Sequence, residues 1–222
     1  MTATKRIDYK RELRELYAPG GEPVILNVPA LAYLMIDGHR VLGRGVRVAV
    51  AVEALYTVAY AAKFAVKRAP DGIDYGVMPL EGLWWTPDMS KFTTQDKSAW
   101  DWTMMIMQPD QVTTVVFEDA RTKATKKKSL DAISRVRLER FTEGLAAQIR
   151  HVGPYDAEGP TIERLHAFIA EQGYERAGKH HEIYLSDPRR AAPEKMKTIL
   201  RQPVVHGGTA AIGSPSTLPH YG

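Results

Sequence analysis

The pattern of hydrophobic and polar positions along the chain switches between the spacing typical of strands and that typical of helices. The same order of strand and helix patterns occurs twice. Residues 23–38 are rich in strand-forming residues and close on a glycine, which is typical of extended structure. Small and apolar residues at helical spacing predict a helix over about 46–68, where the sequence APDG ends it. Two more strands are predicted around 75–86 and 100–107, separated by a polar loop.

The second half of the chain repeats this order. A proline opens a helix predicted over 109–128, and residues 137–153 are again extended and close on a glycine. An amphipathic helix is predicted over 157–174, followed by a strand over 180–188 and another over 197–204.

Short sequence matches indicate that the two halves are an internal repeat. ALAYLMIDG (30–38) and LAAQIRHVG (145–153) are apolar segments of equal length that close on glycine, and EGLWWTPD (81–88) matches HEIYLSDP (181–188). Both halves also end in Gln-Pro. We therefore expect an α+β fold of two pseudo-symmetric strand-helix-strand-strand units, which form an antiparallel sheet with helices on one face and a central groove.

The predicted organisation is a single domain over 22–205 with a segment at each end. The polar start of the chain predicts a flexible or peripheral arm without a secretory signal, and the Gly/Ser/Pro-rich end predicts a disordered tail. The parts are the arm (1–21), the first unit (22–108), the linker helix (109–128), the second unit (135–205) and the tail (206–222).

Composition narrows the class of protein. With 44% hydrophobic and 25% charged residues, the 222-residue chain can bury a core, and its lack of cysteine excludes disulfides and thiolate chemistry. We expect a cytoplasmic protein that is a monomer or weak dimer. The longest apolar run, 46–66, contains Arg47, Glu53 and Lys63, so we interpret it as a core helix and expect no membrane partner.

The net charge of +4 is concentrated in the basic segment 121–128. Lysines at a helix end usually complement the helix dipole, and the sequence contains no helix-turn-helix or zinc-knuckle pattern, so we expect no nucleic-acid partner. His180 and His181 diverge on a strand, and no phosphate-binding loop or dinucleotide fingerprint is present, so we expect no metal and no cofactor.

The strand over 180–188 carries the strongest candidate for chemistry. Alternation places Glu182 and Tyr184 on one face, and a carboxylate among strand formers is costly to bury unless it has a function or a partner. In the repeat alignment Glu182 and Tyr184 match Gly82 and Trp84. The groove is therefore predicted to hold one carboxylate between aromatic walls.

Other aromatic residues are placed to join this groove, although core packing is the commoner role for each taken alone. They are Tyr56 and Tyr60 on the first helix, Trp100 and Trp102 on the third strand, and Tyr155. Such a site suits a planar aromatic, possibly cationic small molecule. Glu53, on the first helix, is expected to be a satisfied or edge-facing acid.

The sequence HVGPY (151–155), followed by a helix and HEIYLSDP, resembles the GyrI-like domain family. PALAYLMIDG and EGLWWTPD extend the resemblance to the first unit, so that it covers about 20–205. The same domain is the effector-binding half of MerR-type and AraC-type multidrug regulators. The resemblance implies paired units that bind bulky drugs in a central groove, with Glu182 as the pocket acid and Trp84 and Tyr184 as its aromatic wall.

Some stand-alone members of this family are similar to hydrolases that open the cyclopropane of DNA-alkylating antibiotics. The resemblance thus implies a detoxifying hydrolase, active in antibiotic resistance, in which Glu182 is a general base and a tyrosine such as Tyr184 steadies water or drug. The alternatives are a protein that binds or senses drugs without turnover and, lowest in rank, a protein-interaction module.

Overall fold

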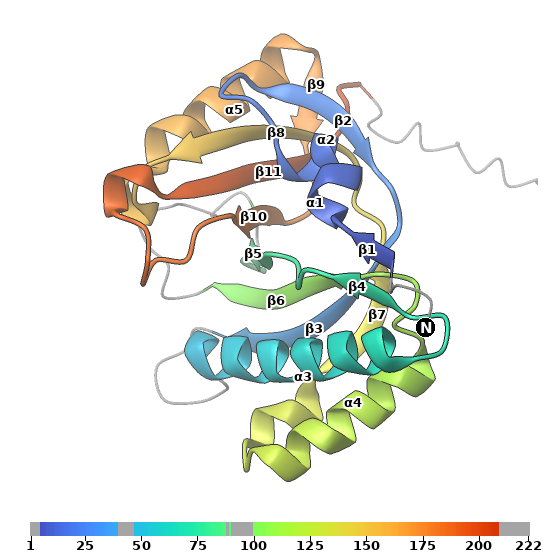
Figure 1. Ribbon diagram of the computed structural model, residues 1–222. Helices are drawn as coiled ribbons and strands as arrows, with labels where there is room; N and C mark the ends of the chain where they lie inside the picture. The colour runs from blue at the N-terminus through green and yellow to red at the C-terminus, as the bar shows by residue number, and fades with distance from the viewer. Residues whose placement is uncertain (1–4, 40–46, 88, 90–99, 209–222) are drawn as a thin grey trace, which may run out of the picture.

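A computed structural model describes residues 5–39, 47–87, 89 and 100–208 (Figure 1). Its α-helices are α1 (Tyr9–Glu12), α2 (Arg14–Tyr17), α3 (Val48–Arg68), α4 (Thr114–Lys127) and α5 (Gly159–Glu171). Short 3-10 helices are η2 (Asp131–Arg135), η3 (Tyr155–Ala157) and η4 (Pro193–Lys195). The strands are β1 (Lys5–Ile7), β2 (Val24–Val28), β3 (Leu31–His39), β4 (Ile73–Tyr75), β5 (Leu80–Trp85), β6 (Asp101–Gln108), β7 (Arg137–Phe141), β8 (Gly144–Val152), β9 (Tyr174–Arg176), β10 (His180–Tyr184) and β11 (Lys197–His206).

The main sheet is symmetric about its central strand pair. Its order is β2-β8-β11-β10-β5-β6-β3-β7, and every neighbouring pair in this order is antiparallel. At the centre, Glu182 on β10 lies directly opposite Gly82 on β5. Because these two positions are equivalent in the repeat, the pseudo-twofold axis passes between them.

Each repeat unit contributes one strand to the half of the sheet that the other unit forms. β2 precedes β3 in the chain but pairs with β8 of the second unit, and β7 precedes β8 but pairs with β3 of the first. This exchange adds backbone hydrogen bonds between the units at both ends of the sheet. The two units are therefore joined at the centre and at the edges, and neither is an independent sheet.

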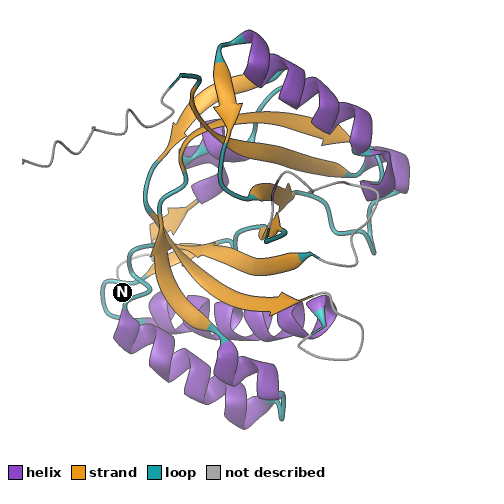
Figure 2. Cartoon of the chain, turned by 180° about the vertical axis from the view of Figure 1, so that it is seen from behind, coloured by secondary structure: helices purple, strands orange, loops and turns teal. Residues whose placement is uncertain are grey.

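The two main helices cover the same face of the sheet. Directly opposite residues in antiparallel strands share a face, so Met104, opposite Gly82, and Leu200, opposite Glu182, lie on the face that carries Glu182. Met104 belongs to the core under α3, and Leu200 belongs to a separate core under α5. Figures 1 and 2 show α5 at one end and α3 with α4 at the other, with β5 and β10 between them. The predicted fold class is confirmed.

α3 is long and apolar enough to cross a membrane by length and composition. In the structure, one side of this helix packs against the sheet and α4, which is the arrangement of a core helix. Its buried residues are Ala51, Ala54, Leu55, Val58, Ala59, Ala62 and Val66.

Some predicted elements differ in their bounds. The strand predicted over 75–86 is shorter, because β5 begins only after Pro79; Tyr75 is the last residue of β4, which pairs with β1 rather than with the main sheet. The helix predicted from 109 begins at Thr114, where the Thr113 hydroxyl accepts a hydrogen bond from the backbone N–H of Val116. The predicted disordered tail lies outside the described residues from 209 onward, as does most of the polar loop before β6.

The segment predicted to be a flexible or peripheral arm carries β1, α1 and α2, and its end is packed against the protein. Leu16 and Tyr17 are buried, and the Tyr17 hydroxyl donates to Oε1 of Glu81 on β5 at 2.7 Å. Glu81 alternates with Gly82, so the arm covers the face of the sheet opposite α3 and α5. We call this the back face.

Four charged side chains form a closed network under the arm. His181 lies 3.0 Å from Oε2 of Glu81 through Nε2 and 2.9 Å from Oε1 of Glu143 through Nδ1, so both ring nitrogens face carboxylates. Arg201 donates to Oε2 of Glu143 at 3.0 Å, to the Gln148 side chain and to the Leu16 carbonyl. Two acids and two bases with buried side chains thus balance their charges, and they link β10 to β5 and β11 on the back face.

The pKa values of this network give the folded protein a pH range of greatest stability. Burial alone lowers the pKa of His181, but Glu143 and Glu81 outweigh it and raise the pKa to about 9. Burial raises the pKa of Glu143, but His181 and Arg201 lower it to about 2. The stabilisation from His181 is complete below its unfolded pKa of 6.5 and is lost as the pH rises through 9. The stabilisation from Glu143 is complete above its unfolded pKa of 4.5 and is lost as the pH falls towards 2.

We therefore expect the free energy of unfolding, measured by urea denaturation, to be highest between about pH 5 and 7 and to decline as the pH is raised towards 10. The His181→Gln variant is expected to be less stable and to lose the His181 contribution to the alkaline decline, because no imidazolium remains to titrate. A wild-type profile that is flat from pH 7 to 10 contradicts the assignment of a charged His181.

Candidate functional site

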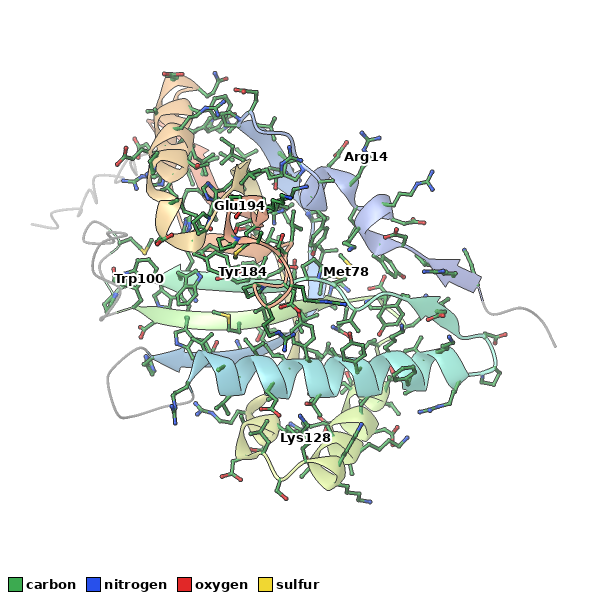
Figure 3. The ribbon with its side chains drawn as sticks, turned by 60° about the vertical axis from the view of Figure 1, so that its left-hand side comes forward. Arg14, Met78, Trp100, Lys128, Tyr184 and Glu194 are labelled. Carbon is green, nitrogen blue, oxygen red and sulfur yellow. The ribbon has the colours of Figure 1, made fainter. Side chains whose placement is uncertain are left out.

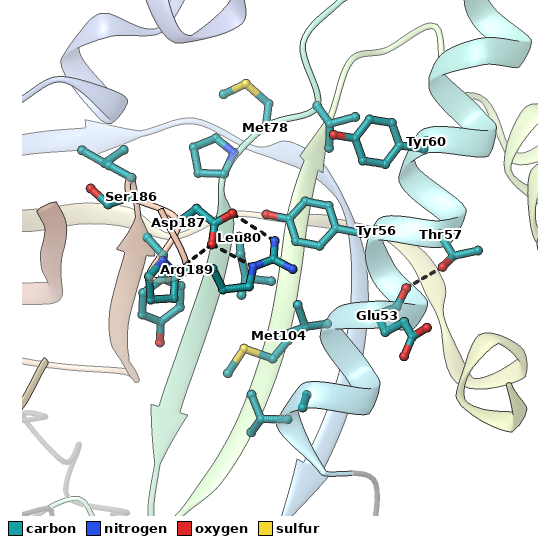
Figure 4. A pocket seen from close by; sticks show the side chains of 18 of the residues that line it. Glu53, Tyr56, Thr57, Tyr60, Met78, Leu80, Met104, Ser186, Asp187 and Arg189 are labelled. Atoms are coloured by element: carbon teal, nitrogen blue, oxygen red, sulfur yellow. Dashed lines mark hydrogen bonds and ion pairs between the residues drawn. The ribbon is translucent and has the colours of Figure 1, made fainter. Parts of the chain in front are cut away.

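A groove of about 1610 Å³ lies over the central strands on the face that carries α3 and α5. Tyr56 and Tyr60 of α3 form one side, as Figure 4 shows, and face Leu80 and the segment with Asp187 and Arg189. The other lining side chains that the prediction concerns are Trp84, Trp100, Tyr155, Glu182 and Tyr184. Figure 3 shows Trp100 and Tyr184 between the two halves of the molecule.

Glu182 is held in the middle of this groove rather than in open solvent. The residue is 6% exposed and lies opposite Gly82 on the twofold axis. A Cβ atom at Gly82 would lie 2.9 Å from the Trp84 indole nitrogen, 3.0 Å from Met104 Cε and 3.1 Å from the Tyr184 hydroxyl. The missing side chain of Gly82 therefore makes the space in which these groups meet.

A chain of hydrogen bonds ends on the Glu182 carboxylate. The Trp84 indole N–H donates to the Tyr184 hydroxyl at 3.1 Å, and this hydroxyl donates to Oε2 of Glu182 at 2.6 Å. Burial, and next the charge of Glu182, raise the pKa of Tyr184 well above its usual value. The phenol therefore keeps its proton and remains a donor to the carboxylate.

Aromatic rings that line the groove lie in three pairs. Trp84 and Trp100 lie 5.7 Å apart between ring centroids, Tyr155 meets Tyr184 edge to face at 5.6 Å, and Tyr56 lies 6.3 Å from Tyr60. Burial, Glu158 and Glu182 raise the pKa of Tyr155 to about 12, so its hydroxyl also stays protonated. The groove thus offers flat apolar walls and phenol donors around one buried acid.

Trp102 is not part of the described groove, although it was predicted to be. It lies opposite Trp84 and so shares its face, but its ring covers Gly38 on β3, where a Cβ atom would lie 2.1 Å from Cζ2 of the indole. At 1% exposure Trp102 is a core residue. Trp85 points to the back face, where the Lys179 ammonium lies 3.2 Å from its ring centroid.

The groove also differs from the prediction of a single carboxylate. Asp187 lines it and forms an ion pair with Arg189 at 3.0 Å, and Glu53 lines it and pairs with Lys128 at 2.5 Å. Each of these acids has a basic partner at the rim, and Glu53 is a satisfied acid as expected. Glu182 differs from both because it is buried among aromatic rings.

Sequence reasoning did not identify Asp187, Arg189 and Met104 as lining residues. The alternation of a strand ends with β10, and the path of the loop after it decides which of its side chains turn towards α3. Within the described ranges, no group of three or more His, Asp or Glu side chains is placed to hold a metal ion.

Comparison with known proteins gives the family. The profile of the GyrI-like small molecule binding domain matches residues 21–204. Three solved structures from Listeria innocua are similar: an uncharacterized conserved protein (44% identity, TM-score 0.82), a hydrolase (42%, 0.77) and a hydrolase encoded by lin2189 (44%, 0.79). Each alignment covers 90% of this chain and 100% of the other. No curated protein matches the chain significantly. The match over most of its length shows that this chain belongs to the family of GyrI-like small molecule binding domains.

Proposed function

We propose that this protein is a detoxifying hydrolase that opens the cyclopropane ring of planar cyclopropyl-indole antibiotics in the groove. The observation that carries the proposal is the Glu182 carboxylate, 6% exposed, at the centre of a groove walled by Trp84, Trp100, Tyr155 and Tyr184. The two structures described as hydrolases, at 42% and 44% identity, support hydrolysis as the class of reaction.

Binding follows from the shape and chemistry of the walls. A flat drug stacks on the indole and phenol rings, and a cationic group on it gains about 0.5–2 kcal/mol for each ring it faces. The buried carboxylate adds charge complementarity in a region of low dielectric constant. The acids at the rim add little, because Arg189 and Lys128 already pair with them.

Hydrolysis needs a base that takes a proton from water and a hydrogen-bond donor to the oxygen that receives the electrons of the broken ring bond. Glu182 takes a proton from a water molecule whose oxygen forms a bond to the cyclopropane methylene carbon. The ring C–C bond breaks, and its electron pair moves to the conjugated carbonyl oxygen, which later takes a proton from Glu182 or solvent. Tyr184 already donates to Glu182, so the protonated Tyr155 hydroxyl is the donor to this carbonyl oxygen.

The Glu182→Gln variant is expected to keep drug binding and to lose turnover by about 10²–10⁴-fold, because the amide preserves the shape of the side chain but cannot accept the proton. Turnover is measured by mass spectrometry of the water adduct of a cyclopropyl-indole drug, and binding by quenching of tryptophan fluorescence.

The matched control is Glu53→Gln, which removes a groove-lining acid that is already paired with Lys128 and should leave turnover unchanged. Turnover by Glu182→Gln at the wild-type rate contradicts the mechanism. Binding of intact drug by the wild type without any water adduct supports the alternative, a protein that binds or senses drugs without chemistry.

Gly82→Ala tests whether the space opposite Glu182 is needed for the ligand. The new methyl group would meet the Trp84 indole nitrogen and the Tyr184 hydroxyl, so the rings must move and the affinity for a planar drug should fall by about tenfold or more. Gly76→Ala is the control, because no atom lies within 4 Å of a Cβ atom there. Equal affinities of the two variants in a fluorescence titration would show that the ligand binds elsewhere.

A further inference from the structure

His180 lies beside Glu182, the candidate general base, on β10, and the two side chains lie on the same face of the sheet. It is 1% exposed, precedes Glu182 by two positions, and is not among the described residues that line the groove. Its Nε2 atom lies 3.5 Å from Oε1 of Glu182. Since Tyr184 donates to Oε2, the two residues that flank Glu182 on its own face approach different oxygens of one carboxylate.

We propose that His180 is a positioning residue that donates its Nε2–H to Oε1 of Glu182. The carboxylate is then held by two donors, Tyr184 and His180, which turn it to one orientation and favour its ionised form. The role in catalysis rests on the proposed function, whereas the contact and its effect on ionisation do not.

The distance and the chemistry agree with this role. A separation of 3.5 Å is long for a hydrogen bond, but such contacts at active sites often tighten when substrate binds. A neutral imidazole with its proton on Nε2 and an imidazolium can both donate here, and either favours the charged carboxylate over the neutral acid. A general base needs this charged form before it can accept a proton from water.

Other titratable groups near this pair come from β10, η3, α5 and β9. Tyr155 on η3 and Tyr184 on β10 stay protonated, and the buried Glu158, at the start of α5, helps to raise the pKa of both tyrosines. The facing positions of β5 and β11 add no titratable side chain, since they are Gly82, Trp84, Thr198 and Leu200. Among the residues that the structure describes, His180 is a basic side chain in contact with Glu182.

His166 on α5 does not compete for that role. Arg176 on β9 has only donors, and its Nη1 lies 3.2 Å from His166 Nδ1, so His166 accepts there and carries its proton on Nε2. Burial, and next the charges of Arg176 and His180, lower the pKa of His166 to about 4, which keeps it neutral near neutral pH. His166 is therefore a neutral acceptor for Arg176 and does not add a positive charge of its own beside His180 near neutral pH.

Two substitutions at His180 separate donation from packing. The side-chain nitrogen of Gln corresponds in reach to Nε2 of histidine, whereas that of Asn corresponds to Nδ1 and falls short. The full chain is labelled with ¹³C at the glutamate carboxyl carbons, the Glu182 signal is assigned by its loss in Glu182→Gln, and its titration is followed by NMR.

We expect His180→Asn to raise the titration midpoint of Glu182 by about one pH unit, and His180→Gln to restore the wild-type midpoint. A midpoint that is unchanged in His180→Asn, or raised equally in both variants, overturns the proposal.

This experiment uses no drug, so its outcome is independent of hydrolysis. If the midpoint moves and no cyclopropyl-indole drug is opened, the inference stands and the proposed function fails. If the drug is opened, the acid limb of the kcat profile should move with the midpoint in His180→Asn. Hydrolysis with an unmoved midpoint leaves the function standing and removes His180 from it.

Discussion

The antiparallel pairing of β5 with β10, which sets Gly82 opposite Glu182, is the constraint on which the rest of the site depends. A side chain at position 82 would fill the space where the Trp84 indole, the Tyr184 hydroxyl and Met104 converge. One half of the duplicated scaffold supplies the acid, and the other supplies the space in which Trp84 and Tyr184 meet. The symmetric fold therefore produces an asymmetric site.

The two faces of β10 use charge in opposite ways. His181 points to the back face and is held between Glu81 and Glu143, in a network that Arg201 completes and the N-terminal arm covers. His180 points to the other face, where its neighbour is the groove acid. Strand alternation thus places a closed, balanced charge network behind a groove whose acid lies within reach of a ligand. The same strand therefore joins the charge network to the groove.

Much of the fold could be predicted because the two halves are a repeat: matching segments predicted equivalent strands and aligned Glu182 with Gly82. The strand register then sets these two residues opposite each other. The position of Trp102 could not be derived, because alternation gives a residue its face but not its distance from the groove. The exchange of β2 and β7 and the network of Glu81, Glu143 and Arg201 depend on contacts between residues far apart in sequence, which no local pattern predicts.

In the mechanism that we propose, the groove delivers a water molecule to a bound cyclopropane ring under the control of the Glu182 carboxylate. Incubation of the full chain with a cyclopropyl-indole drug in ¹⁸O-labelled water, followed by mass spectrometry, tests it most directly. The account predicts repeated turnover to a ring-opened product that carries the label on the former cyclopropane methylene carbon. Recovery of intact drug, or a drug that alkylates the protein instead of water, would contradict it.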